Sequence, residues 1–323
     1  MRQPIRNIPL LPGSLKNLFF PPEKEEYTYF ARAKDCPFAR GDWVVKGAWA
    51  ADASMLAYAR YGAKHMPAED FQENLARGGL QCFNPIGDWN AHGTQGYFAA
   101  NDQFAILAFR GTEADDPVDV IDDTDLLLVL ERDLRPEGTA SRFVLGIPAL
   151  VHHGFKRALD RVWDEVHKCV ADYRQSHPDA EICFTGHSLG AALALLASSR
   201  FADENISLYT YGCPRTGNQE FCGGVLADPR KTTFRFVNLN DSVAHVPLES
   251  AFYRHAPQNC FRFDENGNLS EDDGSFRGDV AALATVFTRF SVNLSLDLAK
   301  IPAPPGLVDH SPARYCIRLW NCV

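Results

Sequence analysis

The chain has 323 residues, 46% of which are hydrophobic, and a formal net charge of −9 at pH 7. This length and apolar content allow a substantial buried core. The negative charge argues against a nucleic-acid partner and against an anionic membrane bound by general electrostatic attraction. No stretch approaches the roughly 18 apolar residues of a membrane-spanning helix. Pro4, Pro9 and Pro12 interrupt the start of the chain and make it a poor signal peptide, so we expect a cytosolic protein or one exported without a cleavable signal.

The cysteines are nine in number, scattered, and without a Cys-x-x-Cys pair. This pattern fits neither a disulfide framework nor a zinc site. Cys183 and Cys213 fall in predicted buried strands, where we expect small apolar core residues. A few of the other cysteines could pair if the protein is exported.

The first half of the chain begins with a segment rich in proline and mixed charge. We interpret residues 1–40 as an extended arm and 41–323 as one domain. The spacing of apolar residues predicts a helix over 43–62. Two strands, 95–100 and 103–109, follow and are joined by a turn at 101–102.

An acidic segment at 113–125 reads as an exposed flap. The apolar run 126–130 that follows predicts a buried strand, with a lipid-binding patch as the alternative. Residues 131–150 are expected to form a loop, and apolar residues at helical spacing predict a helix over 155–173.

The second half of the chain alternates between strands and helices. The predicted elements are a strand at 182–187 with a helix after it, strands at 206–211 and 233–237 with a short helix at 218–226 between them, a hairpin within 253–267 at the sheet edge, a helix at 278–298, and a Pro-rich tail at 301–323. This alternation predicts an α/β fold, a three-layer sandwich with a mainly parallel central sheet.

The pattern Gly-His-Ser-Leu-Gly at 186–190 stands between the predicted strand and its helix. In this context it reads as a nucleophile elbow, with Ser188 at a strained bend. The backbone N–H of Leu189 and the start of the helix would face a developing oxyanion. A chance Gly-x-Ser-x-Gly turn is the alternative, and the strand before and helix after it disfavour that.

An acyl-transfer serine needs a base, an acid and oxyanion donors. Thr112 follows the strand that ends at 109 and could supply an oxyanion donor, while Asp241 follows the strand at 233–237 and suits the triad acid. Three later histidines are candidates for the base. We choose His310, because His245 is too near Asp241 in sequence and His255 lies in the predicted hairpin; His187 is excluded because its side chain should point away from its neighbour Ser188.

Six motifs occur along the chain in a fixed order. They are Phe-Arg-Gly-Thr at 109–112, Val-His-His-Gly-Phe at 151–155, Thr-Gly-His-Ser-Leu-Gly-Ala at 185–191, Tyr-Gly-Cys-Pro-Arg-Thr-Gly-Asn at 211–218, Arg-Phe-Val-Asn-Leu-Asn-Asp at 235–241, and Asp-His at 309–310 with Tyr315. In this combination, over roughly residues 95–318, the chain resembles the class 3 (fungal-type) lipase family of the α/β-hydrolase fold.

The resemblance implies roles for individual residues. Ser188 would be the nucleophile, Asp241 the triad acid and His310 the base, with Thr112 and Leu189 forming the oxyanion hole. It implies structural parts for His153 with Gly154 and for the turn at 212–218.

The chain departs from the family pattern in two places, one of which bears on the substrate. The segment 113–125 corresponds to the lid of family lipases, yet its only bulky apolar residues are Val118, Val120 and Ile121. This weakens the expectation of efficient work on long-chain triglyceride at an oil surface. The N-terminal arm has no clear family counterpart.

The function predicted from these residues is a serine ester hydrolase that cleaves acyl esters of lipids through an acyl-enzyme. Its partners would be a lipid or small acyl-ester substrate and a transient contact with a lipid surface, and no cofactor or metal is implied. A phospholipase A1 and a soluble, feruloyl-type carboxylesterase are the alternatives within this class. A hydrolase-fold binding protein without catalysis is the alternative from another class, and it is disfavoured because every expected role has a residue.

Overall fold

The computed structural model describes most of the chain. The described residues are 1–14, 16–19, 22, 26–31, 42–59, 66–89, 93–111, 128–130, 148–247, 249, 252–256, 259–272, 302–303 and 305–323. The predicted flap at 113–125 and the predicted helix at 278–298 lie outside these ranges.

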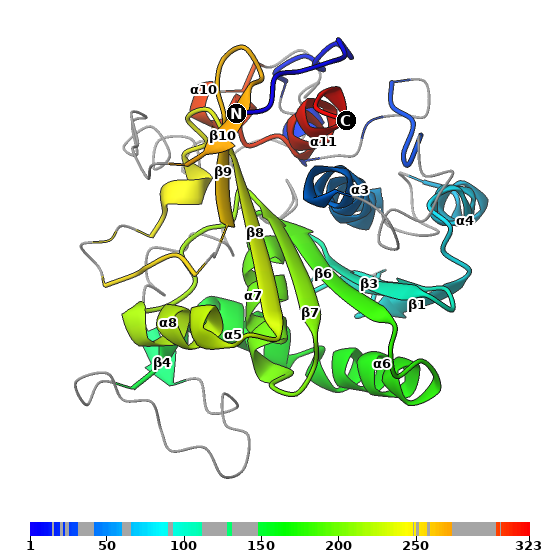
Figure 1. Ribbon diagram of the computed structural model, residues 1–323, viewed down its shortest axis with the longest axis vertical. Coiled ribbons are helices and arrows are strands. Elements are labelled where there is room, and N and C mark those ends of the chain that lie inside the picture. Colours follow the sequence, from blue (N-terminus) through cyan, green and yellow to red (C-terminus); the bar gives the residue numbers. More distant parts are fainter. Residues whose placement is uncertain are drawn as a thin grey trace.

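The helices and strands alternate over much of the chain (Figure 1). The helices are α1 (Lys16–Phe19), α3 (Trp43–Leu56), α4 (Ala68–Arg77), α5 (His153–Asp160), α6 (Trp163–Ser176), α7 (Leu189–Arg200), α8 (Gln219–Ala227), α10 (Pro305–Val308) and α11 (Pro312–Asn321), with 3₁₀ turns η1 (Ala57–Ala59) and η3 (Val243–His245). The strands are β1 (Cys82–Ile86), β2 (Gly96–Ala100), β3 (Phe104–Phe109), β4 (Leu128–Leu130), β5 (Leu150–His152), β6 (Glu181–His187), β7 (Ile206–Tyr211), β8 (Lys231–Asn238), β9 (Asn259–Phe263) and β10 (Leu269–Glu271).

The central sheet has eight strands in the order β1-β2-β3-β6-β7-β8-β9-β10. The neighbours from β3 to β9 are parallel, and β1, β2 and β10 pair antiparallel at the two edges. Because parallel neighbours need crossover connections, helices cover both faces. The predicted mainly parallel sheet is confirmed.

Two apolar cores lie on opposite faces of the sheet. In one core, helices α3 and α11 pack against strand side chains such as Tyr209 and Phe236. In the other, helices α5, α6, α7 and α8 pack against strand side chains such as Phe184 and Leu208. Figure 1 shows α3 and α11 on one side of the sheet and α5, α6 and α7 on the other. Both faces of the central strands are therefore buried, which explains their nearly continuous apolar sequence, and the predicted three-layer architecture is confirmed.

The predicted strands and helices agree with the structure in most places, and three predictions need correction. The predicted helix at 155–173 is two helices, α5 and α6, because the backbone of Val162 leaves the helical region with φ −121° and ψ 7°. The predicted buried strand at 126–130 corresponds to β4, which pairs with β5 in a separate two-stranded sheet, and its residues Leu128 and Val129 are half-buried. Of the predicted hairpin within 253–267, residues 253–256 are not in a strand, and β9 and β10 form the hairpin at the sheet edge.

The tail beyond residue 301 contains α11, which packs against α3. Residues that precede α3 contact the same side of this helix. The Tyr27 hydroxyl (2.6 Å) and the Phe30 N–H (2.6 Å) donate to the buried carboxylate of Asp52 in α3, and so does the indole N–H of Trp320 in α11 (3.0 Å). Residues near the two ends of the chain therefore meet beside α3, where Figure 1 shows both termini on the same side of the molecule. In the ranges that the structure describes, no helix has the length and apolar character needed to cross a membrane.

Candidate active site

Ser188 stands at the bend between β6 and α7, as predicted. Its backbone has φ 59° and ψ −128°, a conformation that non-glycine residues rarely adopt. Its N–H donates to the carbonyl of Tyr211 at 3.0 Å, so the bend is tied to the end of β7. The serine is 6% exposed.

The two glycines of the elbow allow the strand and the helix to meet. A Cβ on Gly186 would collide with the backbone of Gly190, and a Cβ on Gly190 would collide with the carbonyl oxygen of Phe109. The first turn of α7 therefore lies directly against the end of β3. This contact brings the end of β3, where the predicted oxyanion segment begins, next to the serine.

Asp241 and His310 are hydrogen-bonded although they come from distant parts of the chain. A left-handed residue, Leu239 with φ 37°, ends β8 and turns the chain toward Asp241, while His310 lies between α10 and α11. The His310 Nδ1 lies 2.9 Å from Oδ2 and 3.0 Å from Oδ1 of Asp241. Because a carboxylate only accepts, Nδ1 carries the proton and Nε2 is left as the acceptor on the opposite edge of the imidazole.

The Asp241 carboxylate is fully buried and has further donors. The Tyr315 hydroxyl donates to Oδ2 at 2.6 Å, and the N–H groups of Val243 and Ala244 donate to Oδ1 at 2.9 and 3.3 Å. Burial by itself raises the pKa of Asp241, but the charge and hydrogen bond of His310 and the hydrogen bond of Tyr315 outweigh burial and hold this pKa below its usual value. The site therefore keeps a buried, ionised acid.

Gly212 connects Ser188 to this pair. It follows Tyr211, whose carbonyl accepts from Ser188, and it has φ 57°. A Cβ at Gly212 would lie 2.6 Å from Asp241 Oδ2 and 2.8 Å from His310 Nδ1. The turn at 212–218 that the resemblance treated as structural thus includes the backbone that the Asp241–His310 pair packs against.

His187 supports the position of His310 from the other side. Its Nε2 lies 2.6 Å from the backbone carbonyl of His310, which only accepts, so Nε2 donates and Nδ1 accepts from the Tyr58 hydroxyl at 2.8 Å. The rings of His187 and His310 have centroids 4.4 Å apart. The residue that sequence reasoning excluded as a base therefore contacts the residue chosen as the base.

Of the two predicted oxyanion donors, the structure describes Leu189 but not Thr112. Leu189 is the first residue of α7, where a backbone N–H has no acceptor inside the helix. Thr112 lies outside the described residues, which end this segment at Gly111. Gly111 is buried, and a Cβ there would collide with the Tyr58 hydroxyl and approach the His187 carbonyl oxygen to 2.8 Å.

The neutral state of His187 makes the site sensitive to acid. Burial, followed by the charge of His310, lowers the pKa of His187 well below 6.5. As the pH falls below about 6.5, an unfolded histidine takes up a proton that folded His187 refuses, so the stability present above that pH is lost by up to about 1.4 kcal/mol per pH unit. We expect the urea-unfolding free energy to fall less steeply between pH 8 and pH 5 in His187→Asn, whose amide can still donate to His310. Parallel pH profiles would contradict this prediction.

The described cysteines and acidic residues provide no metal centre. No group of three or more His, Cys, Asp and Glu in the described ranges is arranged to hold a metal ion, and the eight described cysteines form no disulfide. Cys183, in β6, and Cys213 are both buried, as predicted, but Cys213 lies in the turn after β7 and not in a strand.

Comparison with known proteins finds similarity in the region that contains most of the motifs. Residues 106–251 match the family model described as lipase (class 3). The secreted mono- and diacylglycerol lipase A of Penicillium cyclopium is 29% identical over 171 residues, which cover 48% of this chain and 55% of that protein. The lipase of Rhizopus niveus is 36% identical over 115 residues, which cover 33% of this chain and 29% of that protein. The chain thus spans about half the length, or less, of these curated relatives.

Solved structures extend the similarity over more of the chain. A mutant form of MDLA from Penicillium cyclopium aligns with a TM-score of 0.53 and 25% identity, covering 76% of this chain and 91% of that one. The mono- and diacylglycerol lipase from Aspergillus oryzae aligns with a TM-score of 0.58, covering 85% and 99%, and at 19% identity it shows the fold alone. Residues 106–251 are thus similar to the class 3 (fungal-type) lipase family, and the chain has the α/β-hydrolase fold of the solved lipases that it resembles.

Proposed function

We propose that this protein is a serine carboxylic ester hydrolase that cleaves acyl esters of lipids, with Ser188, His310 and Asp241 as its catalytic triad. The observation that carries the proposal is the buried Asp241–His310 hydrogen bond beside the strained elbow that holds Ser188. The match of residues 106–251 to the lipase (class 3) family model and the mono- and diacylglycerol lipases among the relatives support an ester of glycerol as substrate.

In the proposed mechanism the protonated Nδ1 of His310 faces Asp241, and Nε2 takes the proton of the Ser188 hydroxyl. Ser188 attacks the ester carbonyl, and the N–H groups of Leu189 and Thr112 stabilise the oxyanion of the tetrahedral intermediate. His310 then gives its proton to the leaving alcohol, and an acyl-enzyme forms. Water, deprotonated by His310, releases the acid and restores the serine.

The pattern of donors around Asp241 supports this division of roles. The carboxylate keeps its charge under full burial because several donors and His310 face it. A fixed negative charge at Nδ1 stabilises the imidazolium that forms when Nε2 takes the serine proton.

We also propose that residues 41–323 form one hydrolase domain with 1–40 as an arm, in keeping with the contacts that the arm makes at Asp52.

A fluorophosphonate probe tests the catalytic proposal directly. We expect the folded protein to be labelled at Ser188, with loss of esterase activity in proportion to labelling, because the probe reacts with an activated serine. Peptide mapping by mass spectrometry identifies the labelled residue. A folded protein that stays unlabelled would instead favour the hydrolase-fold binding protein.

The acyl chain length is a separate question. Among the esters that such a hydrolase could cleave, the acidic character of 113–125 favours soluble or short-chain ones. We expect kcat/KM for p-nitrophenyl esters to be highest for short acyl chains and to change smoothly across the solubility limit. A jump in rate only when aggregates form would instead assign the protein to lipid surfaces, and release of the sn-1 fatty acid from phospholipid vesicles would identify a phospholipase A1.

A further inference from the structure

Two buried arginines lie beside the loop that follows Asp241. Arg235 is in β8 and is 3% exposed, and Arg215 is in the turn at 212–218 and is 8% exposed. Both belong to sequence motifs of the family, and neither contacts the proposed triad through a hydrogen bond in the described structure. Burying a guanidinium is costly unless acceptors surround it, so the acceptors show what these side chains hold.

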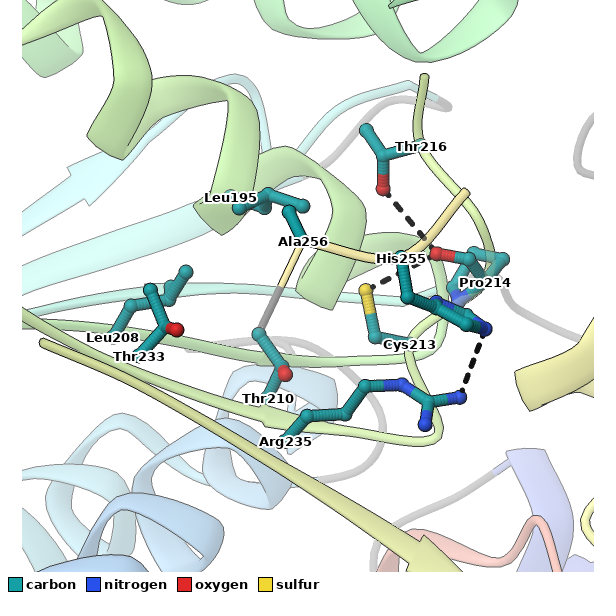
Figure 2. A pocket seen from close by; sticks show the side chains of 10 residues that line it. All are labelled: Leu195, Leu208, Thr210, Cys213, Pro214, Thr216, Thr233, Arg235, His255 and Ala256. Carbon is teal, nitrogen blue, oxygen red and sulfur yellow. Dashed lines mark hydrogen bonds between the residues drawn. The ribbon is translucent and has the colours of Figure 1, made fainter. Parts of the chain in front are cut away.

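Arg235 holds the carbonyl of Ala244. Its Nη2 donates to that oxygen at 2.8 Å and to Nε2 of His255 at 3.1 Å. Figure 2 shows the second contact at the edge of a pocket between the sheet, α7 and the loops of Cys213 and His255. Burial, followed by the charges of Arg235 and Arg215, keeps the pKa of His255 well below its usual value, so this imidazole is neutral and accepts.

The other side of the Arg235 guanidinium is also occupied. Its Nη1 lies 3.3 Å from the sulfur of Cys260 and 3.5 Å from Oδ2 of Asp272, whose side chain is 2% exposed. The negative charge of Asp272 offsets the buried positive charge. The guanidinium is therefore fixed on two sides and cannot follow the loop if the loop moves.

Arg215 holds the next three carbonyls. Its Nη1 donates to the oxygens of His245 and, at 2.9 Å, of Pro247, and its backbone N–H donates to Val246 at 2.8 Å. The carbonyls of residues 244–247 are thus held one after another by two arginines. We call Arg215 and Arg235, with these contacts, the arginine clamp.

The opposite side of the same turn faces the acid. The N–H groups of Val243 and Ala244, in η3, donate to Oδ1 of Asp241. A single 3₁₀ turn is held by poor internal hydrogen bonds, and here the bond from the His245 N–H to Ser242 is 3.1 Å long. The N–H groups of this turn keep their direction only if contacts from outside the turn fix its backbone. The arginine clamp provides such a contact, because Arg235 donates to the carbonyl of Ala244.

We propose that Arg235 and Arg215 are positioning residues for Asp241. They fix the turn at 243–247 so that its amides hold Oδ1 and keep the carboxylate facing Nδ1 of His310. This inference deepens the proposed function and rests on it. We expect the clamp to affect the chemical step, because the hydrogen bonds of its guanidinium groups within the described residues are with the loop after Asp241 and its surroundings, and none is with Ser188 or His310.

The experiment measures kcat per active site, with sites counted by the burst of a fluorophosphonate or p-nitrophenyl ester. Arg235→Lys and Arg215→Lys keep the charge but cannot make the same set of hydrogen bonds. We expect kcat per site to fall about tenfold in each, and about 100-fold in Arg235→Met, with KM for a short-chain ester unchanged, because small displacements of a catalytic group have effects of this size.

Two controls separate positioning from folding. Leu75→Ala, on the buried face of α4, should lower the melting temperature and the number of titratable sites but leave kcat per site unchanged. Arg230→Lys replaces a partly exposed arginine that is paired with Asp203 and Asp228, and it should change neither quantity. If the arginine variants only lose sites, as Leu75→Ala does, the inference is wrong.

A double-mutant cycle asks whether Arg235 acts through the acid. In an Asp241→Asn background, Arg235→Lys should lower kcat per site less than twofold, because the carboxylate that it positions is gone. A full tenfold further loss would overturn the inference while leaving the triad intact. Failure of the wild-type protein to label at Ser188 would overturn the proposed function itself. If Arg235→Met does not fold, the two lysine variants carry the test.

Discussion

Replacing Ser188 with alanine is expected to lower kcat for ester hydrolysis by roughly 10⁵- to 10⁶-fold, because the nucleophile of a triad cannot be replaced by its partners. The hydroxyl makes no helix-capping hydrogen bond, so its removal leaves the fold unchanged. The measurement is hydrolysis of a short-chain p-nitrophenyl ester, with fluorophosphonate labelling in parallel. Retention of more than a thousandth of the wild-type rate in purified Ser188→Ala would identify another nucleophile.

The same position predicts a gain in stability from a different substitution. With φ 59° and ψ −128°, Ser188 occupies a conformation that costs a non-glycine residue about 1–3 kcal/mol. Glycine relieves this strain and loses about 0.5–1 kcal/mol through the entropy of the unfolded chain. We expect Ser188→Gly to unfold at a higher urea concentration than Ser188→Ala. A lower midpoint would show that the bend is held without strain.

Asp241→Asn is expected to lower kcat roughly 10⁴-fold with little change in KM, because an amide cannot hold the tautomer of His310 that a carboxylate holds. The asparagine has one acceptor oxygen where the aspartate meets four donor groups, and its own N–H₂ would face donors in a fully buried site. Steady-state kinetics on a soluble ester, per labelled site, gives both constants.

Two neighbouring substitutions serve as controls for Asp241→Asn. Asp309 precedes His310 and its carboxylate accepts from the Asn240 N–H at 3.4 Å, so Asp309→Asn should keep most of the activity. Tyr315→Phe removes one donor from the Asp241 carboxylate and should cost about tenfold. If Asp309→Asn were the more damaging change, the acid of the triad would have been wrongly assigned.

The elements around Ser188 were predictable because their signals are local. Both faces of β6 and β7 are buried, so each strand contributes apolar residues to the core on either side of the sheet, and the glycines at 186 and 190 stand where the strand and helix approach each other. Asp241 was predictable for a related reason, since it comes directly after β8 at the edge where parallel strands end. The break between α5 and α6 was not, because the apolar residues on both sides of it contact the same core and preserve the helical period.

The supports of the site could not be predicted, because each of them joins distant segments. Tyr58 follows α3, His187 ends β6 and His310 precedes α11, and only the folded sheet brings these three together. The arginine clamp is hidden for a similar reason: its contacts are with backbone carbonyls, which carry no sequence signature. Tyr315 was noticed as part of a motif, yet its hydroxyl could be assigned to Asp241 only from the structure.

The meeting of early and late residues at Asp52 has a consequence for how the protein is made. A ribosome delivers Tyr27, Phe30 and Asp52 long before Trp320, and His310 emerges only shortly before it. A growing chain can therefore form the elbow and the sheet around Ser188 while the base is still missing and Asp52 still lacks its indole donor. In the proposed mechanism, hydrolytic activity therefore requires synthesis to pass His310 and α11 to dock on α3, so a chain that stalls before residue 310 would carry Ser188 without its base.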